Sequence, residues 1–331
     1  MTTPALSIAI PCFNEEETLP SCIAGVEQYV ASKAPGSVEV VIVDDGSRDG
    51  TWAVIERLVR GRAGWRAVRF LANRGSHMAL RCAYRHTTGT RVVNLPVDLQ
   101  DPIDNIDRLQ RAMDEQGADA VLAVRQTRED GWYAETTSHL YHGAMHLVNL
   151  RNVPVEGTSQ FLMTRRVVQR INGFNDQGFT LEGFLASEPL KLAIVWYDRA
   201  AAVGRVSRWT FTRKVQHALN TILGFSNVPI RALSCTGAAV ALGGLLYAAF
   251  VVLRFGLIGG SATGWPSLMT VVLVLGGLNL LALGLVGEYV WRILDESRRR
   301  PLYQIEDRIG CEDGQHPGIA LAIADGSRSI E

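Results

Sequence analysis

The sequence lacks the cysteine patterns of a disulfide framework or a zinc site. Its five cysteines include no C-x-x-C pair, and their number is odd. Isolated thiols of this kind are typical of proteins in a reducing environment. A net charge is also absent, because 33 basic residues balance 33 acidic ones. No global field therefore favours nucleic acid or a charged membrane surface, and any electrostatic attraction must be local.

Two common nucleotide-binding motifs are missing as well. The chain contains neither G-x-G-x-x-G nor G-x-x-x-x-G-K-[ST], which weighs against a dinucleotide-binding domain and against a P-loop. The first residues, "MTTPALSIAIPCFNEEE", lack a basic region followed by an apolar region and a cleavage site. We therefore expect no signal peptide.

Two long uncharged runs dominate the C-terminal third. One extends from residue 232 to 253 and the other from 255 to 287, with Arg254 between them. Each is long enough to cross about 30 Å of hydrocarbon as a helix, although a buried hairpin of a soluble protein is an alternative. Basic residues lie before the first run and after the second, including Arg205, Arg208, Arg213, Lys214, Arg231, Arg292, Arg298, Arg299 and Arg300. The positive-inside rule then predicts a multi-pass protein with its N-terminal domain and its C-terminus in the cytoplasm.

The first 124 residues predict an α/β domain. Runs rich in Val and Ile alternate with helical patterns, and they are apolar throughout, as in a sheet covered on both faces. The expected strands are residues 6–11, 38–45, 65–71, 91–97 and 118–124, and the expected helices lie near 15–30, 51–60, 76–86 and 103–116. This order predicts a mostly parallel sheet.

Polar residues follow each expected strand. They are Asn14 and Glu15, Asp44 and Asp45, Asn73 and Arg74, Asp98 to Asp101, and Arg125. Ligands of such sheets bind beyond the carboxyl ends of the strands, so these residues predict a binding site, although ordinary solvated loops are the alternative. "DDGSRDGT" alone could be a plain turn before a helix at Thr51.

Four segments in this order resemble the family 2 glycosyltransferases with a GT-A fold: "IPCFNEEETL", "VIVDDGSRDGTW", "NRGSHMALRCAY" and "DLQDP". Later segments, "YDRAAAVGRVSRW", "ILGFSNVPIRAL" and the region from Gly264 to Tyr303, are similar to the bacterial polyprenyl-phosphate glycosyltransferases, relatives of dolichyl-phosphate mannose synthase with two C-terminal membrane helices. The resemblance covers roughly residues 5–306. It implies transfer of one sugar from a UDP- or GDP-sugar to a polyprenyl phosphate, with inversion, at the cytoplasmic face of the inner membrane.

The resemblance also implies roles for individual residues. Pro11, Phe13 and Glu15 match the segment that holds the nucleotide, and Asp44 with Asp45 match acids that read base and ribose. Asp98 and Gln100 match two positions of a D-x-D-x-Q site for Mg²⁺ or Mn²⁺, and Arg125 matches a basic residue near the phosphates. The segment associated with the acceptor phosphate is matched by Arg199, Arg205, Ser207, Arg208 and Trp209.

Three departures from the family pattern bear on activity. Pro96 stands where the first metal-binding aspartate is expected, so Asp98 must hold the ion with help from Asp101, Glu15 or the substrate diphosphate. Asp101 is instead expected to cap the helix that begins near Ile103. Near Ser159, "GTSQFLMTRR" lacks the acid that has been considered a general base, and Glu182 lies where the family has a basic segment.

The predicted organisation has four parts: a cytoplasmic GT-A domain over residues 1–210, a juxtamembrane amphipathic segment over 211–230, a two-helix membrane anchor over 231–295 and a cytoplasmic tail over 296–331. Gly276, Gly277 and Gly284 could support a homo-oligomer or pack the two spans together. Two other functions stay open: a membrane-bound paralogue that binds nucleotide or lipid phosphate without turnover, and a transferase to a glycan.

Overall fold

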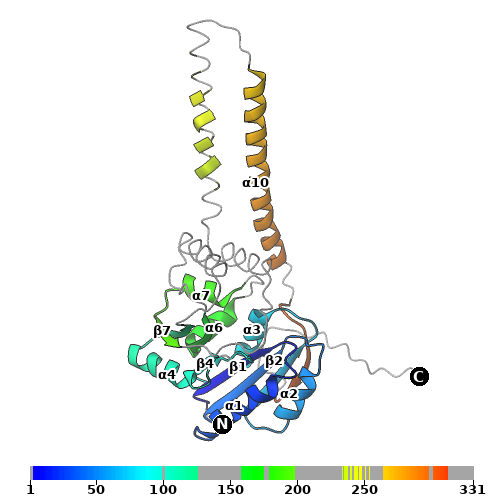
Figure 1. The fold of residues 1–331 in the computed structure, drawn as a ribbon, viewed down its shortest axis with the longest axis vertical. Helices are drawn as coiled ribbons and strands as arrows, with labels where there is room; N and C mark the ends of the chain where they lie inside the picture. The colour runs from blue at the N-terminus through cyan, green and yellow to red at the C-terminus, as the bar shows by residue number, and fades with distance from the viewer. Residues whose placement is uncertain are drawn as a thin grey trace, which may run out of the picture.

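The described residues form one eight-stranded sheet with helices on both faces (Figure 1). The computed structural model describes residues 3–98, 101–125, 158–174, 179–197, 264–297 and 301–311, and single residues between 233 and 253. The strands are β1 Leu6–Cys12, β2 Val38–Asp44, β3 Trp65–Phe70, β4 Arg91–Asn94, β5 Ala120–Arg125, β6 Thr158–Thr164, β7 Leu192–Tyr197 and β8 Ile305–Ile309. The helices are α1 Leu19–Ala31, α2 Thr51–Val59, α3 Ser76–His86, α4 Asn105–Gln116, α6 Arg165–Gly173, α7 Leu181–Ser187 and α10 Trp265–Ser297.

The sheet confirms the predicted α/β class. Its strand order is β7-β5-β6-β4-β1-β2-β3-β8. Four neighbouring pairs are parallel, namely β1 with β2, β1 with β4, β2 with β3 and β5 with β7. Two strands run in the opposite direction: β6 lies between β4 and β5, and β8 pairs with β3 at the edge. The sheet is therefore mixed, with its central strands parallel as expected.

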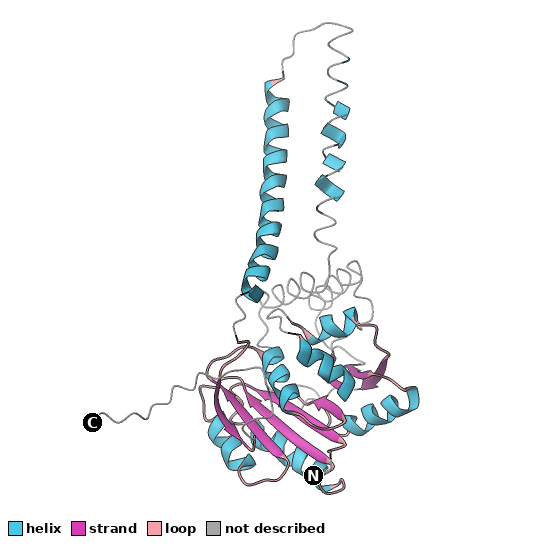
Figure 2. Ribbon diagram, turned by 180° about the vertical axis from the view of Figure 1, so that it is seen from behind, coloured by secondary structure: helices cyan, strands magenta, loops and turns pink. Residues whose placement is uncertain are grey.

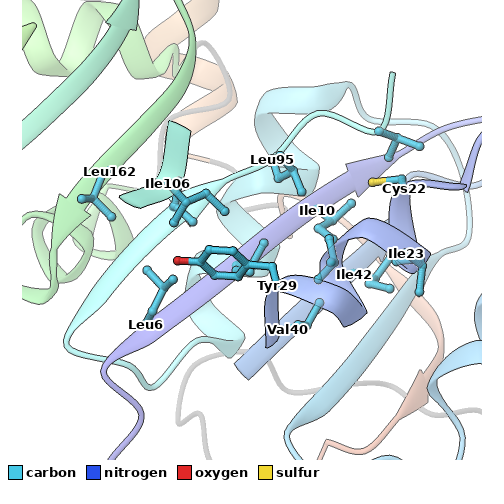
Figure 3. Close-up of a cluster of buried hydrophobic side chains, with 14 of the residues drawn as sticks. Leu6, Ile10, Cys22, Ile23, Tyr29, Val40, Ile42, Leu95, Ile106 and Leu162 are labelled. Carbon is cyan, nitrogen blue, oxygen red and sulfur yellow. The ribbon is translucent and has the colours of Figure 1, made fainter. Parts of the chain in front are cut away.

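Hydrophobic cores on both faces explain why the strands are apolar throughout. On one face, Ile8 and Ile10 of β1 pack with Ile42 of β2 and with buried residues of α1, α2 and α4. Figure 3 shows Ile10 and Ile42 of this cluster together with Ile23 of α1. On the other face, Ala9 of the same strand and Val41 of the next belong to a cluster with α3, α6 and α7. Successive side chains of a strand point to opposite faces, so a sheet covered twice needs apolar residues at nearly every position.

The limits of β4 and α1 differ from the prediction for local reasons. β4 ends at Asn94 rather than 97. The amide of Leu95 still donates to the carbonyl of Ala9 at 2.9 Å, but Pro96 has no N–H with which to continue the ladder. α1 begins at Leu19 rather than near 15, with a proline in its first turn, where its missing N–H is not needed.

α10 extends away from the sheet on the side of α6 and α7, and the two views agree on this (Figures 1 and 2). It is 33 residues long, and several of its side chains are not described. Described apolar side chains along it are exposed, among them Leu268, Val272, Leu280, Leu283 and Ile293. Among the residues that the structure describes, no helix is both long and apolar enough to count as a membrane span.

After α10 the chain returns to the sheet as β8, which the sequence did not lead us to expect. β8 pairs antiparallel with β3, Ala67 opposite Ile309 and Arg69 opposite Asp307. Just before it, Leu302 and Tyr303 are buried, and the Tyr303 ring stacks on Phe70 with 4.6 Å between centroids. Part of the predicted tail is therefore built into the domain.

Candidate active site at the carboxyl edge of the sheet

The ends of four adjacent strands meet at one edge, as the polar strand ends predicted. Cys12 of β1 lies opposite Asp44 of β2, and Asp44 lies opposite Arg69 of β3. On the other side of β1, Ala9 lies opposite Asn94, so the chain leaves β4 toward Asp98 beside the end of β1. Because parallel neighbours end together, the residues after these strands share one edge.

Ser47 connects the ends of β1 and β2. Its backbone N–H donates to Asp44 Oδ1 at 3.0 Å, and its hydroxyl donates to the same oxygen. The Ser47 hydroxyl also accepts from the N–H of Asn14 at 2.9 Å. Asn14 has a positive φ of 53°, a conformation that asparagine tolerates better than most residues. These bonds fix the two loops relative to each other.

Asp44 is a buried carboxylate of which one oxygen accepts hydrogen bonds and the other accepts none from the described residues. It is 0% exposed, and burial raises the pKa of its carboxyl group, while the bonds from Ser47 and the charge of Arg69 act in the opposite direction. The Nε of Arg69 lies 3.6 Å from Oδ2, and no described residue donates a hydrogen bond to that oxygen. An acceptor of this kind is costly to bury and is stabilised by any donor that reaches it.

Asp45 orders the loop after β3. Its two oxygens accept from the backbone N–H groups of Arg74, at 2.7 Å, and Gly75, at 2.8 Å. Burial raises the pKa of Asp45 to about 6 against the lowering effect of these bonds. Gly46 lets the two loops approach, since a Cβ there would lie 2.7 Å from the Ala72 carbonyl carbon. Asp45 therefore holds the loop in place, and its predicted contact with base or ribose stays a prediction.

Glu15 and Asp98 approach the same region from two strands. The pKa of Cys22, on α1, is raised to about 12, first by burial and then by the charges of Asp98 and Glu15. The pKa of the Cys12 thiol is raised by burial and then by Asp44 and Glu15 among others. Carboxylates that follow β1, β2 and β4 are therefore close enough to raise the pKa of two neighbouring thiols, and their predicted roles in binding stay predictions. Pro11 and Phe13, at the end of β1, are partly exposed beside them.

Asp101 does not cap the next helix, so that prediction was wrong. α4 begins at Asn105 with Asp104 at its N-cap position. Asp101 is 2% exposed, and its Oδ1 accepts a hydrogen bond from the hydroxyl of Tyr197, the last residue of β7. The bond ties the loop after β4 to the end of β7. No local pattern in the sequence indicates this bond, because its partners are far apart in the chain.

Several predicted site residues lie outside the described residues. They are Gln100, Arg199, Arg205, Ser207, Arg208 and Trp209, and for Arg125 and Ser159 only the backbone is described. Among the described residues, no group of three or more His, Cys, Asp or Glu side chains could hold a metal ion. The described carboxylates could therefore hold a divalent ion only if oxygens of the substrate completed its coordination shell. Mg²⁺ is commonly bound in this way, by one or two carboxylates together with phosphate oxygens.

Comparisons with known proteins show the family of the chain. Residues 7–172 match the model of the family described as Glycosyl transferase family 2. A relative named "Bactoprenol glucosyl transferase", from Shigella phage SfX, is 33% identical over 305 residues, which are 92% of this chain and 99% of the relative. The "Undecaprenyl-phosphate 4-deoxy-4-formamido-L-arabinose transferase" of Edwardsiella ictaluri is 29% identical over 311 residues, 92% of this chain and 94% of the relative.

A solved structure is also similar. It is the mannosyltransferase PcManGT from Pyrobaculum calidifontis in complex with GDP-Man and Mn²⁺, 17% identical, with a TM-score of 0.49, covering 85% of this chain and 88% of that chain. The family model spans half of the chain, and the phage relative is similar over almost all of it. The chain therefore belongs to the family 2 glycosyltransferases.

Proposed function

We propose that the protein transfers one sugar from a UDP- or GDP-sugar to a polyprenyl phosphate at the cytoplasmic face of the inner membrane, using a GT-A domain. One observation carries the proposal: in a family 2 chain, Glu15, Asp44 and Asp98 come from three strand ends to one edge. The names of the relatives, which are similar over at least 92% of this chain, support a polyprenyl phosphate as the acceptor.

The donor would lie along this edge. Asp44 offers a buried acceptor near the end of β2, and Asp98 would hold a divalent ion together with the diphosphate. When bound, such an ion acts as a Lewis acid and stabilises the charge of the departing nucleotide diphosphate. Gln100 and Arg125 are proposed to assist at the diphosphate, and Pro96 is expected to weaken the affinity for the ion.

The acceptor explains why the acid missing near Ser159 matters little. A phosphate monoester is largely anionic at neutral pH, so its oxygen can attack the anomeric carbon without a general base. The protein then contributes by orienting the two substrates and excluding water. Arg199, Arg205, Ser207 and Arg208 are proposed to bind the acceptor phosphate, since arginine pairs with phosphate through two parallel hydrogen bonds.

Two membrane spans fit the path of the chain. β7 and β8 belong to one sheet, so the residues between Tyr197 and Ile305 leave the domain and return to it. Any membrane crossings in this stretch must therefore be even in number. The two uncharged runs, 232–253 and 255–287, supply one crossing each. The exposed apolar side chains of α10 would then face lipid, where they need no protein partner.

The test is a transfer assay with purified full-length protein, undecaprenyl phosphate and a panel of UDP- and GDP-sugars. We expect a lipid-linked monosaccharide with one donor, and a loss of at least about 100-fold in kcat for Asp98→Ala, because electrostatic stabilisation of the leaving group is a large part of catalysis. Asp104→Asn is the matched control, since Asp104 is exposed and its side chain makes no cap hydrogen bond. A wild-type protein that yields no product with any donor would contradict the proposal.

A further inference from the structure

Arg69 is shared between two carboxylates that come from distant parts of the chain. Its Nε lies 3.6 Å from Asp44 Oδ2 and 3.2 Å from Glu306 Oε2. Asp44 ends β2 at the candidate site, whereas Glu306 belongs to β8, after the apolar region. The guanidinium also lies 5.9 Å from the centre of the Trp52 ring, which limits its freedom. β8 therefore supplies a charge to the site that the sequence analysis did not identify.

A β-bulge brings Glu306 to this position. Arg69 is paired with Asp307, but the next residue, Phe70, is paired with Ile305, so Glu306 is the extra residue of the bulge. In a regular ladder Glu306 would face the side of the sheet opposite to Arg69, because side chains alternate. Bulges re-aim individual side chains and are frequent beside active sites. The bulge is therefore the local feature that directs Glu306 to the guanidinium.

Sharing Arg69 keeps Asp44 from forming a full ion pair. Although the guanidinium is near, no described residue donates a hydrogen bond to Asp44 Oδ2. Arg69 Nε makes no hydrogen bond to either carboxylate, and its Nη2 donates to the Ser47 carbonyl at 3.5 Å. Without Glu306, Asp44 would be the only described carboxylate near the guanidinium, which would then be drawn onto Oδ2. A direct charged hydrogen bond would then occupy the oxygen.

We infer that Glu306 is a positioning residue for nucleotide binding: it holds Arg69 away from Asp44, so that Oδ2, which is buried and has no described donor, accepts from a ring N–H of the nucleobase when the nucleotide enters this edge. The inference rests on the proposed function, since it assumes that this edge holds the nucleotide. Uracil and guanine both carry such a donor, so it applies to either base. The chain that returns from the apolar region is thereby a part of the donor site.

The experiment measures the Kd of UDP and of GDP by calorimetry with the full-length protein in detergent. We expect Glu306→Gln to raise the Kd of the preferred nucleotide about fivefold, the scale of a partly exposed ion pair. Glu306→Asp, which keeps the charge, should recover most of the affinity. Asp307→Asn is the matched control, because this neighbouring carboxylate accepts only from the N–H of Arg308 among the described donors.

A double-mutant cycle separates positioning from stability. In an Arg69→Gln background, Glu306→Gln should have no further effect on the Kd, and the melting temperature without nucleotide should be the same in Glu306→Gln and its parent. In the transfer assay, the KM for the donor should rise with the Kd while kcat is unchanged. An unchanged or lower Kd in Glu306→Gln, with the wild type binding normally, would overturn the inference alone. A wild type that binds neither nucleotide would overturn the proposed function and this inference with it.

Discussion

Glu39 is the residue whose replacement should cost the domain most without touching the candidate site. It is 2% exposed at the amino edge of the sheet, opposite to the edge that carries the site. Its Oε1 accepts from the Ser7 hydroxyl at 2.6 Å and from the N–H groups of Thr88 and Gly89. Its Oε2 accepts from the Thr88 hydroxyl at 2.8 Å and from Arg66 at 2.9 Å. The carboxylate thus joins β1, β2, β3 and the loop before β4.

Glu39→Gln should destabilise the domain by about 2–4 kcal/mol. The amide oxygen can replace Oε1, but an NH₂ group then faces the Thr88 hydroxyl and Arg66. The change loses the charged bond from Arg66, worth about 1.5–3 kcal/mol, and weakens the bond with the Thr88 hydroxyl, which is worth about 1 kcal/mol. Since domains of this size are stable by only about 5–15 kcal/mol, the effect should be measurable by urea unfolding of the purified protein. Glu115→Gln, at an exposed position of α4, is the control.

The same residue predicts a pH dependence. Burial alone raises the pKa of Glu39, but the bonds from Ser7, Thr88 and Gly89 outweigh it, so the pKa lies below its usual value. The folded state then binds the proton less readily than the unfolded chain. This stabilisation is complete above the unfolded pKa of about 4.5 and is lost as the pH falls through the folded value. The unfolding free energy of Glu39→Gln should therefore lack this decrease at acidic pH. A change in unfolding free energy below about 1 kcal/mol, or an unaltered decrease at acidic pH, would refute the reasoning.

Two further predictions concern metal and topology. Pro96→Asp should restore a second carboxylate and lower the Mn²⁺ concentration for half-maximal activity by roughly tenfold, and no change in metal dependence would argue against a metal at Asp98. In a variant without Cys235 and Cys311, a membrane-impermeant maleimide should label Ser261→Cys from outside intact cells and Ser327→Cys only after permeabilisation. Labelling of both from outside would place the two residues on the same side and contradict a single crossing between them.

The sequence predicted the first five strands because their signal is local. Runs such as "VEVVIVDD" are buried on both faces, and the observed β2 ends one residue earlier than expected. The polar residues at one edge of the sheet were predicted from the same strand pattern, since the carboxyl ends of parallel strands are neighbours. Antiparallel β6 was not predicted between β4 and β5, because its place depends on pairing with strands that are distant in sequence. The Tyr197–Asp101 bond was missed for the same reason.

β8 shows most clearly why prediction from local sequence patterns fails after the long apolar region. "IEDRI" is a short segment with three charges, and nothing in it marks a strand. It is held by the open edge of β3 and by Tyr303, which is buried against Phe70 on the face of α3. The consequence concerns function as well as fold. The chain between β7 and β8 would carry the lipid acceptor, while its return strand delivers Glu306 to the edge proposed for the nucleotide. A shift of α10 would therefore reach the edge proposed for the nucleotide through only the few residues between Ser297 and Glu306.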